Sequence, residues 1–401
     1  MRVLIIANVA GKAEAGGAGV IYNIAKELCR FGHTVKVMFA EDLLPAPRWP
    51  ARFRTVEFAR RAARYISESK SEFDIANIYA PCGFSYGSLR RKRGVNAGPP
   101  YVLTMHGLEE RRNYAMGREA KRGRADYFRW RNLCWQRFYH MRTYRWSIEA
   151  ADHCIVTNRE SLLFLQMQYG LAPDRVWFVP NGVGQEFFHQ RNFSGAYEPK
   201  LLFVGTWIDH KGIYNLAEAF AQLLGKHPGT RLTIAGCAEP EEKIRRSFSA
   251  AVQCALEVRR FVPRTEMPAL YAEHDIFVLP SLVEGMPLVL LEAMASGLAV
   301  VTTESSGMTD LVEDGYDGLL TIPGDTPSLL AALNKVSRDP QLRERLGSAA
   351  QEKMKRYTWS RSARGHEAVL LRALGIQPVS SVLQEEARSP ERLTDSSKVL
   401  P

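Results

Sequence analysis

The stretch of this 401-residue chain most suited to chemistry runs from 280 to 300 and holds two glutamates, Glu284 and Glu292, with seven residues between them. The apolar run ending at Leu279 predicts a buried strand, so Glu284 falls in the loop that follows it. Pro287 favours the first turn of a helix, which places Glu292 inside an otherwise apolar helix. A carboxylate buried there needs a partner, which could be the hydroxyls of a ligand or a neighbouring backbone group or arginine.

The beginning of that predicted helix offers free donors. The N–H groups of Met286, Leu288 and Val289 lack intrahelical acceptors and can bind phosphate oxygens, so one segment could hold a sugar, a diphosphate and a ribose in sequence. Lys211 precedes another predicted helix, 213–224. An ammonium there could neutralise a diphosphate leaving group, although a solvated surface lysine is the alternative.

Glycines and a histidine follow two predicted strands in the first half. The loop 11–19, which contains Gly16 and Gly17, could bring backbone N–H groups to a phosphate or sugar hydroxyl, or could simply be a tight turn. It does not form a G-x-G-x-x-G fingerprint, which weighs against a dehydrogenase. His106 directly follows the predicted strand 101–105, at an edge where open α/β sheets bind ligands, although a lone histidine is more often structural.

Two strand–helix cycles must position these groups. We expect helices between the strands, including 20–31, which ends at a glycine, and a last helical stretch, 340–374. Alternation that begins anew after a linker near 180–199 predicts an α/β protein of two Rossmann-like, doubly wound domains, 1–183 and 184–375, followed by a disordered tail, 376–401. The expected strands are 3–7, 33–39, 74–79, 101–105, 153–157, 176–179, 201–204, 232–235, 276–279 and 299–302.

The chain carries a formal net charge of +10, and segment 111–146 mixes basic and aromatic residues. Such a segment suits an anionic partner, and we weigh an interfacial segment on anionic lipid against a helix whose aromatic side chains pack on their own domain. Nucleic acid is not expected as a partner because no recognised binding module is present. The residues concerned are Arg129, Trp130, Arg131, Trp135, Arg137, Tyr139, Arg142, Tyr144 and Trp146.

The compartment is inferred from what the chain lacks. The first apolar run is too short for a secretory signal, and no segment has the length and apolarity of a membrane span. The scattered cysteines form no C-x-x-C pair, so we expect reduced thiols. These features predict a cytoplasmic protein, with peripheral association at the inner face of the membrane as an open option.

Taken together, these motifs resemble the retaining glycosyltransferases of family 4, which have the GT-B fold. The resemblance rests on the paired glutamates followed by Ala-Met-Ala-Ser-Gly, on the Lys211-Gly212 loop and on the Pro-Asn-Gly-Val turn at 180–183, and it covers about 1–375. It implies two domains that face each other across a cleft, with the last helix packing back on the first. It also implies a nucleotide diphosphate sugar as donor, with a UDP-sugar favoured, and no cofactor or bound metal.

The resemblance further implies roles for single residues. Glu284 would touch the donor hexose, Glu292 would hold the ribose, and Lys211 would stabilise the leaving diphosphate. His106 would meet the sugar near its 6-hydroxyl, and the backbone around Val262 would frame the base. The catalytic set is then His106, Lys211 and Glu284, and the donor-binding set is Gly16, Gly17, Gly205, Thr206, Val262, Met286, Leu288, Val289 and Glu292.

Three positions depart from the family pattern. Thr206 stands where an arginine usually gives a second phosphate cation, so phosphate binding depends more on Lys211, helped by His210. Gly184 replaces the usual aspartate after the Pro-Asn-Gly-Val turn, and the acidic residue expected behind a later glycine pair is Asp310. These changes affect the expected donor affinity and donor identity and leave the core of the predicted site in place.

We therefore expect a hexosyltransferase that acts with retention on a glycan or lipid-linked acceptor, in cell-surface polysaccharide or glycolipid synthesis. No carboxylate pair suits a double displacement, and the resemblance implies front-face attack. Two alternatives remain: an enzyme of the same fold that hydrolyses or epimerises nucleotide sugars, and a non-catalytic basic adaptor for membrane or nucleic acid. Two buried-site glutamates are costly in a protein that binds no polar ligand, which weighs against the adaptor.

Overall fold

The computed structural model describes residues 1–12, 16–46, 53–94, 97–123, 139–189 and 198–377. The described residues within 1–108, 129–181 and 359–401 form one compact unit, the first unit. Those within 109–128 and 182–358 form the second unit. Segment 109–123, which the sequence assigned to the first domain, therefore groups with the second unit, and the chain returns to the first unit from Trp359 onward.

The first unit is built on a parallel sheet in the order β2-β1-β3-β4-β5-β6. Its central strands, β3 and β4, are buried at every residue, which is typical of a parallel sheet covered on both faces. Register is regular, with Ala76 beside Tyr101 and Tyr79 beside Thr104. The strands are β1 (Arg2–Ile6), β2 (Thr34–Met38), β3 (Ile75–Tyr79), β4 (Tyr101–Met105), β5 (His153–Val156) and β6 (Val176–Phe178).

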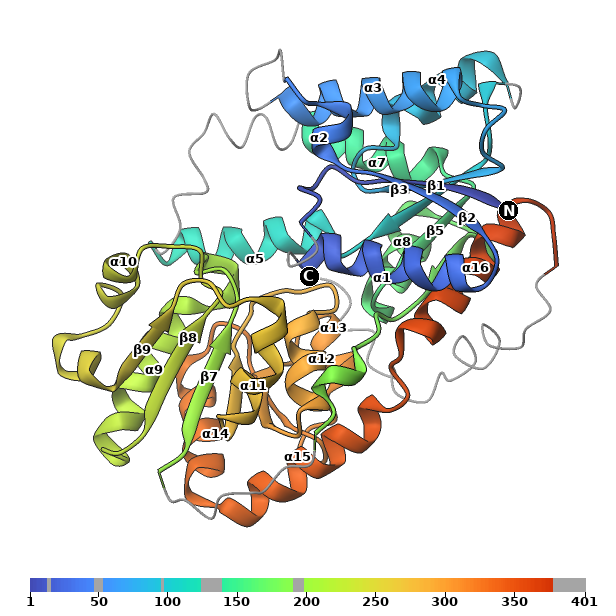
Figure 1. Ribbon diagram of the computed structural model, residues 1–401. Coiled ribbons are helices and arrows are strands. Elements are labelled where there is room, and N and C mark those ends of the chain that lie inside the picture. The colour runs from blue at the N-terminus through green and yellow to red at the C-terminus, as the bar shows by residue number, and fades with distance from the viewer. Residues whose placement is uncertain (13–15, 47–52, 95–96, 124–138, 190–197, 378–401) are drawn as a thin grey trace. The chain divides into compact units, whose positions relative to one another are not determined.

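Helices cover both faces of this sheet. In Figure 1, α3, α4 and α7 lie on one side of the strands, and α1 and α16 lie on the other. The last helix, α16, packs on α1 and on strands β3 to β5. The helices of the unit are α1 (Gly16–Arg30), α2 (Ala40–Leu43), α3 (Arg54–Glu68), α4 (Phe84–Arg93), α7 (Met141–Ala150), α8 (Arg159–Tyr169) and α16 (Trp359–Ala373).

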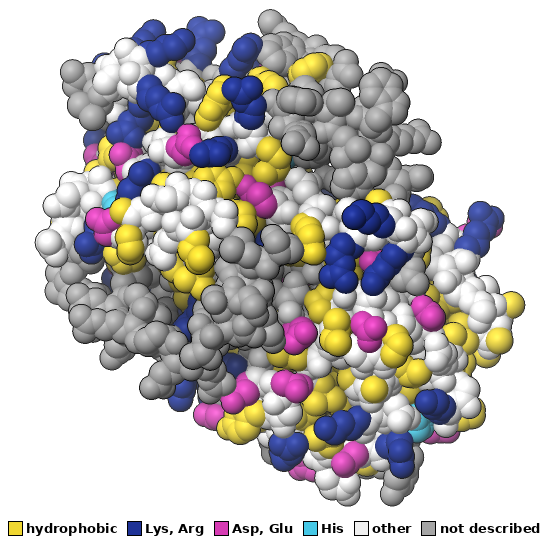
Figure 2. All heavy atoms as spheres, turned by 180° about the vertical axis from the view of Figure 1, so that it is seen from behind, with side chains coloured by type: hydrophobic (Ala, Val, Ile, Leu, Met, Phe, Trp, Pro, Cys, Tyr) yellow, Lys and Arg dark blue, Asp and Glu magenta, His cyan; other side chains and the backbone are white. Residues whose placement is uncertain are grey.

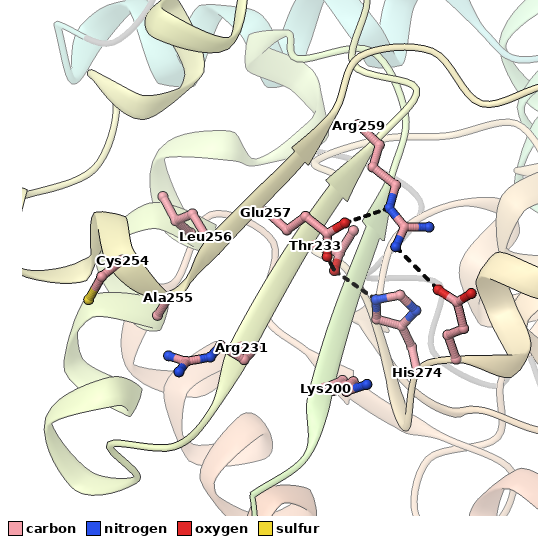
Figure 3. Close-up of a pocket in the computed structure, with 10 residues that line it drawn as sticks. Lys200, Arg231, Thr233, Cys254, Ala255, Leu256, Glu257, Arg259 and His274 are labelled. Carbon is pink, nitrogen blue, oxygen red and sulfur yellow. Dashed lines mark hydrogen bonds and ion pairs between the residues drawn. The ribbon is translucent and has the colours of Figure 1, made fainter.

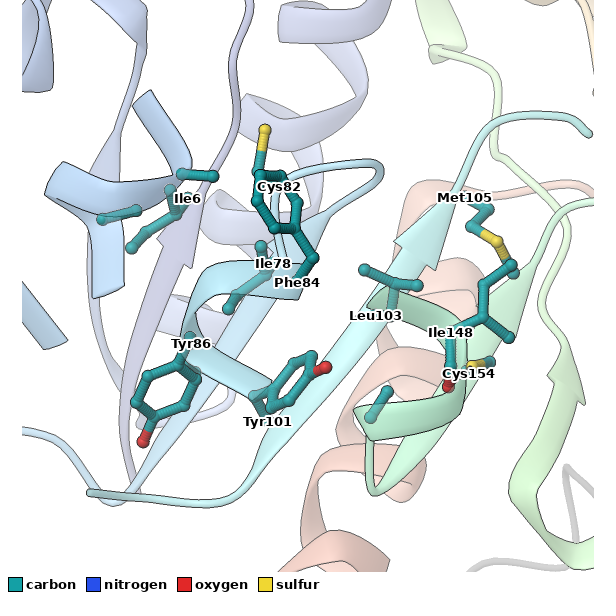
Figure 4. Packing of buried hydrophobic residues seen from close by; sticks show 14 of the residues in the cluster. Ile6, Ile78, Cys82, Phe84, Tyr86, Tyr101, Leu103, Met105, Ile148 and Cys154 are labelled. Carbon is teal, nitrogen blue, oxygen red and sulfur yellow. Dashed lines mark hydrogen bonds between the residues drawn. The ribbon is translucent and has the colours of Figure 1, made fainter. Parts of the chain in front are cut away.

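The core between the sheet and α3, α4 and α7 is aromatic and aliphatic. Tyr86 and Tyr101 meet edge to face with ring centroids 5.6 Å apart and both are fully buried. Their hydroxyls donate to the carbonyls of Pro99 and Ser147, which removes the cost of burying them. Figure 4 shows these rings with Leu103, Ile148 and other members of the cluster. This packing fixes the strands whose carboxyl ends carry candidate site residues.

The second unit has its own parallel sheet, in the order β12-β11-β10-β7-β8-β9. The chain enters at the centre with β7, adds β8 and β9 on one side and β10 to β12 on the other. Two doubly wound Rossmann-like units are thus present, as the sequence predicted. The strands are β7 (Lys200–Val204), β8 (Arg231–Ala235), β9 (Leu256–Arg259), β10 (Ile276–Leu279), β11 (Ala299–Thr303) and β12 (Leu319–Thr321).

Helices α9 and α14 pack against each other in this unit, and α12 packs against α15. Segment 109–121 forms α5, which packs beside the 3₁₀ turn η7 (Asp209–Lys211). The helices are α5 (Glu109–Lys121), α9 (Ile213–Lys226), α10 (Glu241–Arg245), α11 (Met267–Ala272), α12 (Leu288–Ala295), α13 (Gly307–Leu311), α14 (Thr326–Arg338) and α15 (Pro340–Met354).

The structure differs from the sequence-based expectations at several elements. Strands β9 and β12 were not predicted, because half of the four residues of β9 are charged and β12 has only three residues. The expected helix 340–374 is two helices, α15 and α16, separated at 355–358 and belonging to different units. The first helix begins at Gly16 rather than near residue 20, so Gly16 and Gly17 form its first turn and are not loop residues.

Candidate functional site

The second unit has one topological switch point, between β7 and β10. These strands are neighbours in the sheet, but the chain leaves them toward opposite sides, which opens a crevice at their carboxyl ends where α/β proteins bind ligands. The loop 205–212 follows β7 and the loop 280–287 follows β10. The predicted residues Gly205, Thr206 and Lys211 lie on the first loop, and Glu284 and Met286 lie on the second.

Lys211 and Glu284 meet at this switch point. The Lys211 ammonium lies 2.5 Å from Glu284 Oε1, and both side chains are about six-sevenths buried, at 15% and 14% exposed. Ser281 also donates to Glu284 Oε1, at 2.9 Å. The lysine is therefore not the solvated surface residue of the alternative interpretation. The Lys211 ammonium thus lies at the carboxyl edge of the sheet, where α12 also begins at Leu288.

Backbone contacts hold the two loops together. The N–H of Leu282 donates to the carbonyl of His210 at 2.7 Å, which ties the residue before Lys211 to the loop of Glu284. Gly212 has φ +70°, and a Cβ there would lie 2.0 Å from the carbonyl oxygen of Pro280. Only glycine permits both this left-handed backbone and so close an approach. The position of Lys211 is therefore fixed by main-chain packing.

Glu292 is buried inside α12 and has protein partners on both oxygens. Its exposure is 3%, the Arg264 guanidinium forms an ion pair with Oε1, and the Tyr271 hydroxyl donates to Oε2 at 3.0 Å. Arg264 also lies over the Phe187 ring, 4.7 Å from its centroid. Burial raises the pKa of Glu292, and the arginine opposes that rise. The structure thus shows the alternative of an arginine partner, and the ribose role stays a prediction.

The backbone that the sequence predicts to bind the donor lies at the start of α12. Pro287 precedes the helix, so Leu288 and Val289 are its first two residues, and both are half-buried. Their N–H groups have no carbonyl a turn earlier to bond. Met286 is buried, and Thr206 is exposed. Gly205 has φ +146°, and a Cβ there would lie 3.8 Å from Cε of Lys211.

Val262 and His210 lie on the same unit. Val262 is half-buried in the turn after β9, two residues before Arg264. His210 is half-buried next to Lys211, and burial lowers its pKa, helped by the positive charges of Lys211 and Arg112. A neutral imidazole at this position can accept or donate a hydrogen bond. It does not supply the second cation that the family's usual arginine would provide at the position of Thr206.

The remaining predicted residues belong to the first unit. Gly16 and Gly17 open α1, where a Cβ at Gly16 would meet no atom within 4 Å, so the first turn of the helix is open. His106 follows β4 and is exposed, with its ring 5.0 Å from that of Tyr79. Although part of its surface is accessible, burial by the surrounding protein lowers the pKa of His106 to about 4, helped by the charge of His366. Both features lie at the carboxyl edge of their own sheet.

The basic aromatic segment is described only in part. Arg129, Trp130, Arg131, Trp135 and Arg137 lie outside the described residues, as does the tail from 378. Tyr144 is buried and donates to the carbonyl of Gly107 at 3.2 Å, which is a packing role. Trp146 is 42% exposed and lies beneath Arg142, with a distance of 5.6 Å between the guanidinium carbon and the ring centroid. One aromatic side chain thus packs inward and another faces solvent.

Sequence reasoning missed Arg264, Tyr271 and Ser281. The first two partner Glu292, and Ser281 partners Glu284. Ser281 lies three residues before Glu284, so proximity in the chain was a usable signal. Arg264 and Tyr271 lie more than twenty residues from Glu292, and only the fold brings them together.

Two further observations concern the described residues as a group. They contain no cluster of three or more His, Cys, Asp or Glu side chains arranged to hold a metal ion. Across the part of the chain that the structure describes, every helix is too short or too polar to traverse a bilayer. The expectation of a metal-free reaction stays a prediction.

Comparison with known proteins agrees with this arrangement. The sequence model described as "Glycosyl transferases group 1" matches residues 184–353, and that described as "Glycosyltransferase Family 4" matches residues 15–187. A D-inositol 3-phosphate glycosyltransferase of Streptomyces bingchenggensis is 30% identical over 236 residues, which cover 54% of this chain and 52% of that protein. The chain spans about half the length of such curated relatives.

Two solved structures share the fold. Sucrose-phosphate synthase from Thermosynechococcus elongatus has a TM-score of 0.75 at 19% identity and covers 93% of this chain and 99% of its own. HepE from Anabaena, solved in complex with UDP-glucose, has a TM-score of 0.64 at 18% identity and covers 92% of this chain and 98% of its own. At these identities the likeness shows the fold alone.

Proposed function

This chain belongs to glycosyltransferase family 4, and we propose that it transfers a hexose, with retention, from a nucleotide diphosphate donor to a glycan or lipid-linked acceptor. The observation that carries the proposal is the Lys211–Glu284 pair at the switch point of the second unit, at the same strand-end edge as the first turn of α12. A UDP-sugar is the favoured donor, in keeping with the UDP-glucose bound by the Anabaena protein of the same fold.

In the proposed reaction the bond between the anomeric carbon and the β-phosphate oxygen breaks, and the acceptor hydroxyl oxygen bonds to that carbon from the same face. The hydroxyl proton leaves with the departing phosphate. Negative charge grows on the diphosphate, where Lys211 and the N–H groups of Leu288 and Val289 stabilise it. Glu284 accepts hydrogen bonds from the hexose hydroxyls and so orients the sugar.

The ion pair itself prepares this step. Without donor, Glu284 neutralises the part-buried Lys211 ammonium, which would otherwise be costly to desolvate. When a diphosphate arrives, Lys211 exchanges a carboxylate for phosphate oxygens, and Glu284 becomes available to sugar hydroxyls. The exchange keeps both charges partnered throughout and needs little movement, because the backbone contacts at Gly212 and Leu282 hold the loops.

We place the acceptor side of the protein at the first unit. A groove of about 660 Å³ lies between α3, α4 and α7, with Phe84, Leu89 and Trp146 as apolar lining and Arg60, Lys92 and Arg93 as basic lining. Figure 2 shows Lys and Arg side chains gathered beside hydrophobic ones over this unit, in the upper part of that view. Such a surface suits an anionic lipid headgroup, which supports peripheral association with the inner face of the membrane.

Donor and transfer are tested by the release of nucleoside diphosphate from UDP-, GDP- and ADP-hexoses, with and without a lipid or glycan acceptor extract. We expect release from one donor, increased by acceptor. Release that is independent of acceptor would identify a hydrolase instead. No release, together with no thermal shift from any nucleoside diphosphate, would favour a non-catalytic adaptor.

Membrane association is tested by co-sedimentation with vesicles of neutral and of anionic phospholipid. We expect binding to anionic vesicles that weakens in Lys92→Ala/Arg93→Ala and falls with added salt. Replacement of the Arg residues between 129 and 145 should also weaken it. Equal binding by all variants would leave these residues with packing roles only.

A further inference from the structure

Helix α5 lies at the carboxyl edge of the second unit, where Lys211 and Glu284 meet. It packs beside η7, the turn that ends at Lys211. Just after the helix, the Arg122 guanidinium donates to the carbonyl of Gly324 at 2.9 Å, in the loop that follows β12. The buried Glu119 pairs with Arg122 at 2.8 Å. These contacts fasten α5 to the loops that follow two strands of this sheet.

The loop after β10 belongs to the same group of contacts. A Cβ at Gly324 would lie 3.5 Å from Glu119 Oε1 of α5 and 3.5 Å from Leu282 Cδ2 of that loop. The N–H of Leu282 in turn donates to the carbonyl of His210, next to Lys211. Helix α5 therefore lies on the loops that flank the switch point of the second unit.

Arg112 brings a positive charge from α5 to this group. Burial lowers the pKa of His210, and the charges of Lys211 and Arg112 add to that effect, so Arg112 lies near the turn of Lys211. The Arg112 guanidinium donates to Glu109 at 2.5 Å, and its side chain is 40% exposed. Its Nε is buried and has no hydrogen-bond acceptor among the described residues. The guanidinium is thus accessible and incompletely bonded.

An arginine with a structural role in the same unit has different partners. In Figure 3, Arg259 bonds Glu257 at 2.7 Å and Glu273 at 3.2 Å, so its guanidinium joins two carboxylates of the protein. Arg112 pairs with a carboxylate only three residues before it on the same helix, and pairs at this spacing contribute little to stability. Glu109 is the first residue of α5, where the free N–H groups of the helix also favour a carboxylate. Arg112 can therefore exchange Glu109 for another anion at small cost.

The proposed leaving group calls for a cation besides Lys211. Lys211 is already paired with Glu284, and the uncharged Thr206 adds no cation to its loop. Charge that develops on a departing diphosphate is stabilised best by groups held in place beforehand. On the premise of the proposed function, we propose that Arg112 is a further catalytic residue that binds the β-phosphate of the donor.

In this role the Arg112 guanidinium leaves Glu109 and bonds the phosphate with parallel N–H groups, an arrangement that an ammonium cannot offer. Lys211 and Arg112 then hold one phosphate from two elements, the turn after β7 and helix α5. Helix α5 thus contributes to the donor site of the second unit, although the segments that end at 108 and begin at 139 group with the first unit.

The test is calorimetry on the full chain with UDP, GDP and ADP and with the corresponding nucleoside monophosphates. In Arg112→Ala the affinity for the diphosphate that the wild type binds should fall roughly tenfold or more, and kcat for diphosphate release should fall to a similar degree. The affinity for the monophosphate should change by roughly threefold at most, because the monophosphate lacks the β-phosphate. Equal weakening of both ligands would indicate a structural role of Arg112 and overturn the proposal.

Two further variants sharpen this result. Thr206 is exposed on the loop after β7, so Arg112→Ala/Thr206→Arg, which restores a cation on that loop, should recover most of the lost affinity and turnover. Arg118→Ala removes an exposed arginine from the same helix and should bind the diphosphate as the wild type does. Equal losses in Arg112→Ala and Arg118→Ala would show a nonspecific charge effect and contradict the role of Arg112.

Failure of this inference can be told apart from failure of the proposed function. If Lys211→Ala lowers kcat and Arg112→Ala does not, the donor site stands and the role of Arg112 is wrong. If the wild type binds none of the three diphosphates and releases none from their hexose donors, both the proposed function and the role of Arg112 are overturned.

Discussion

The two sheets of this protein are built alike, but their carboxyl edges carry different kinds of residue. In the second unit the charged side chains at this edge are held in ion pairs, Lys211 with Glu284 and Glu292 with Arg264. We call this edge the locked edge. In the first unit the candidate residues are more accessible: a Cβ at Gly16 would meet none of the described atoms within 4 Å, and His106 is exposed. One edge presents fixed charge and the other presents accessible backbone and a single ring.

This difference matches two chemical tasks. Stabilising charge on a departing diphosphate requires dipoles and cations that are already oriented, because reorganisation during the reaction would raise the barrier. Contact with a sugar or an acceptor needs shape and hydrogen bonds more than fixed charge. Substitutions at the carboxyl edge of the second unit should therefore affect turnover more than substitutions at the carboxyl edge of the first unit.

The largest effect is expected at Lys211. Lys211→Ala should lower kcat by roughly a hundredfold to a thousandfold, because it removes one preorganised stabiliser of the leaving group. KM for the donor should change much less. Diphosphate release measured over a range of donor concentrations gives both constants, with Lys226→Ala as a control for the loss of an exposed lysine. A kcat within a factor of three of wild type would refute the leaving-group role.

Glu292 should affect binding more than turnover. Glu292→Ala removes the proposed hydrogen bonds to the ribose and should weaken donor binding roughly tenfold to a hundredfold, since each bond to a charged group contributes about 1.5–3 kcal/mol. It also leaves Arg264 without its partner, so we expect a loss of roughly 2 kcal/mol in unfolding free energy, limited because Arg264 keeps contact with water.

Calorimetry with UDP and thermal melts separate these two effects. Arg264→Ala is the companion variant, because it breaks the same ion pair without touching the proposed ribose ligand. Equal weakening of UDP binding by Glu292→Ala and Arg264→Ala would mean that Glu292 stabilises the fold and does not bind the ribose.

The part of this arrangement that sequence could predict was local. Strand β4 and the helix after Pro287 follow from apolar runs and turn residues, and the positions of Glu284 and His106 at strand ends follow from those elements. The partner of Glu292 did not follow, because Arg264 lies in the 3₁₀ turn after β9 and is brought to α12 through α11, which packs on both. Such packing between elements depends on the whole fold.

The grouping of α5 with the second unit was missed for a related reason. Its sequence carries many charges and little apolar periodicity, so nothing in it indicates which core it joins. Contacts decide: the Arg122 guanidinium donates to the carbonyl of Gly324 at 2.9 Å and pairs with the buried Glu119. Charged segments of this kind are placed by specific partners far along the chain.

Close backbone packing at the locked edge can be tested at Gly307. A Cβ at this position would lie 1.6 Å from the carbonyl oxygen of Gly285, one residue after Glu284. Gly307→Ala should therefore destabilise the protein by roughly 1–3 kcal/mol through overpacking and should lower kcat by displacing Glu284. Thermal melts and diphosphate release measure the two effects.

Gly225 in α9 provides the control for this variant. A Cβ there would meet no atom within 4 Å, so Gly225→Ala should raise stability by roughly 0.5–1 kcal/mol through helix propensity and leave kcat unchanged. Similar effects of both substitutions would mean that the edge at Gly285 is not tightly packed.

The smallest predicted effect lies in the first unit, at the buried His366 on α16. Burial lowers the pKa of His366 to about 4, and its Nδ1 bonds the Ser362 carbonyl at 3.0 Å. Because the folded pKa is below the unfolded value, the unfolded chain binds the proton first as pH falls. The contribution of this residue to stability is complete above about pH 6.5 and is lost progressively toward pH 4, with about 1 kcal/mol lost at pH 5.5.

Replacing this ring tests the argument directly. His366→Gln should reduce the difference between unfolding free energies measured at pH 7 and pH 5.5 by about 1 kcal/mol relative to wild type, because the variant has no proton to bind at that position. Chemical denaturation at the two pH values measures it. If the wild-type and variant stability curves ran parallel between these pH values, burial of His366 would not penalise its charged form. The first unit would then lack this acid-sensitive point beneath an edge that is otherwise open.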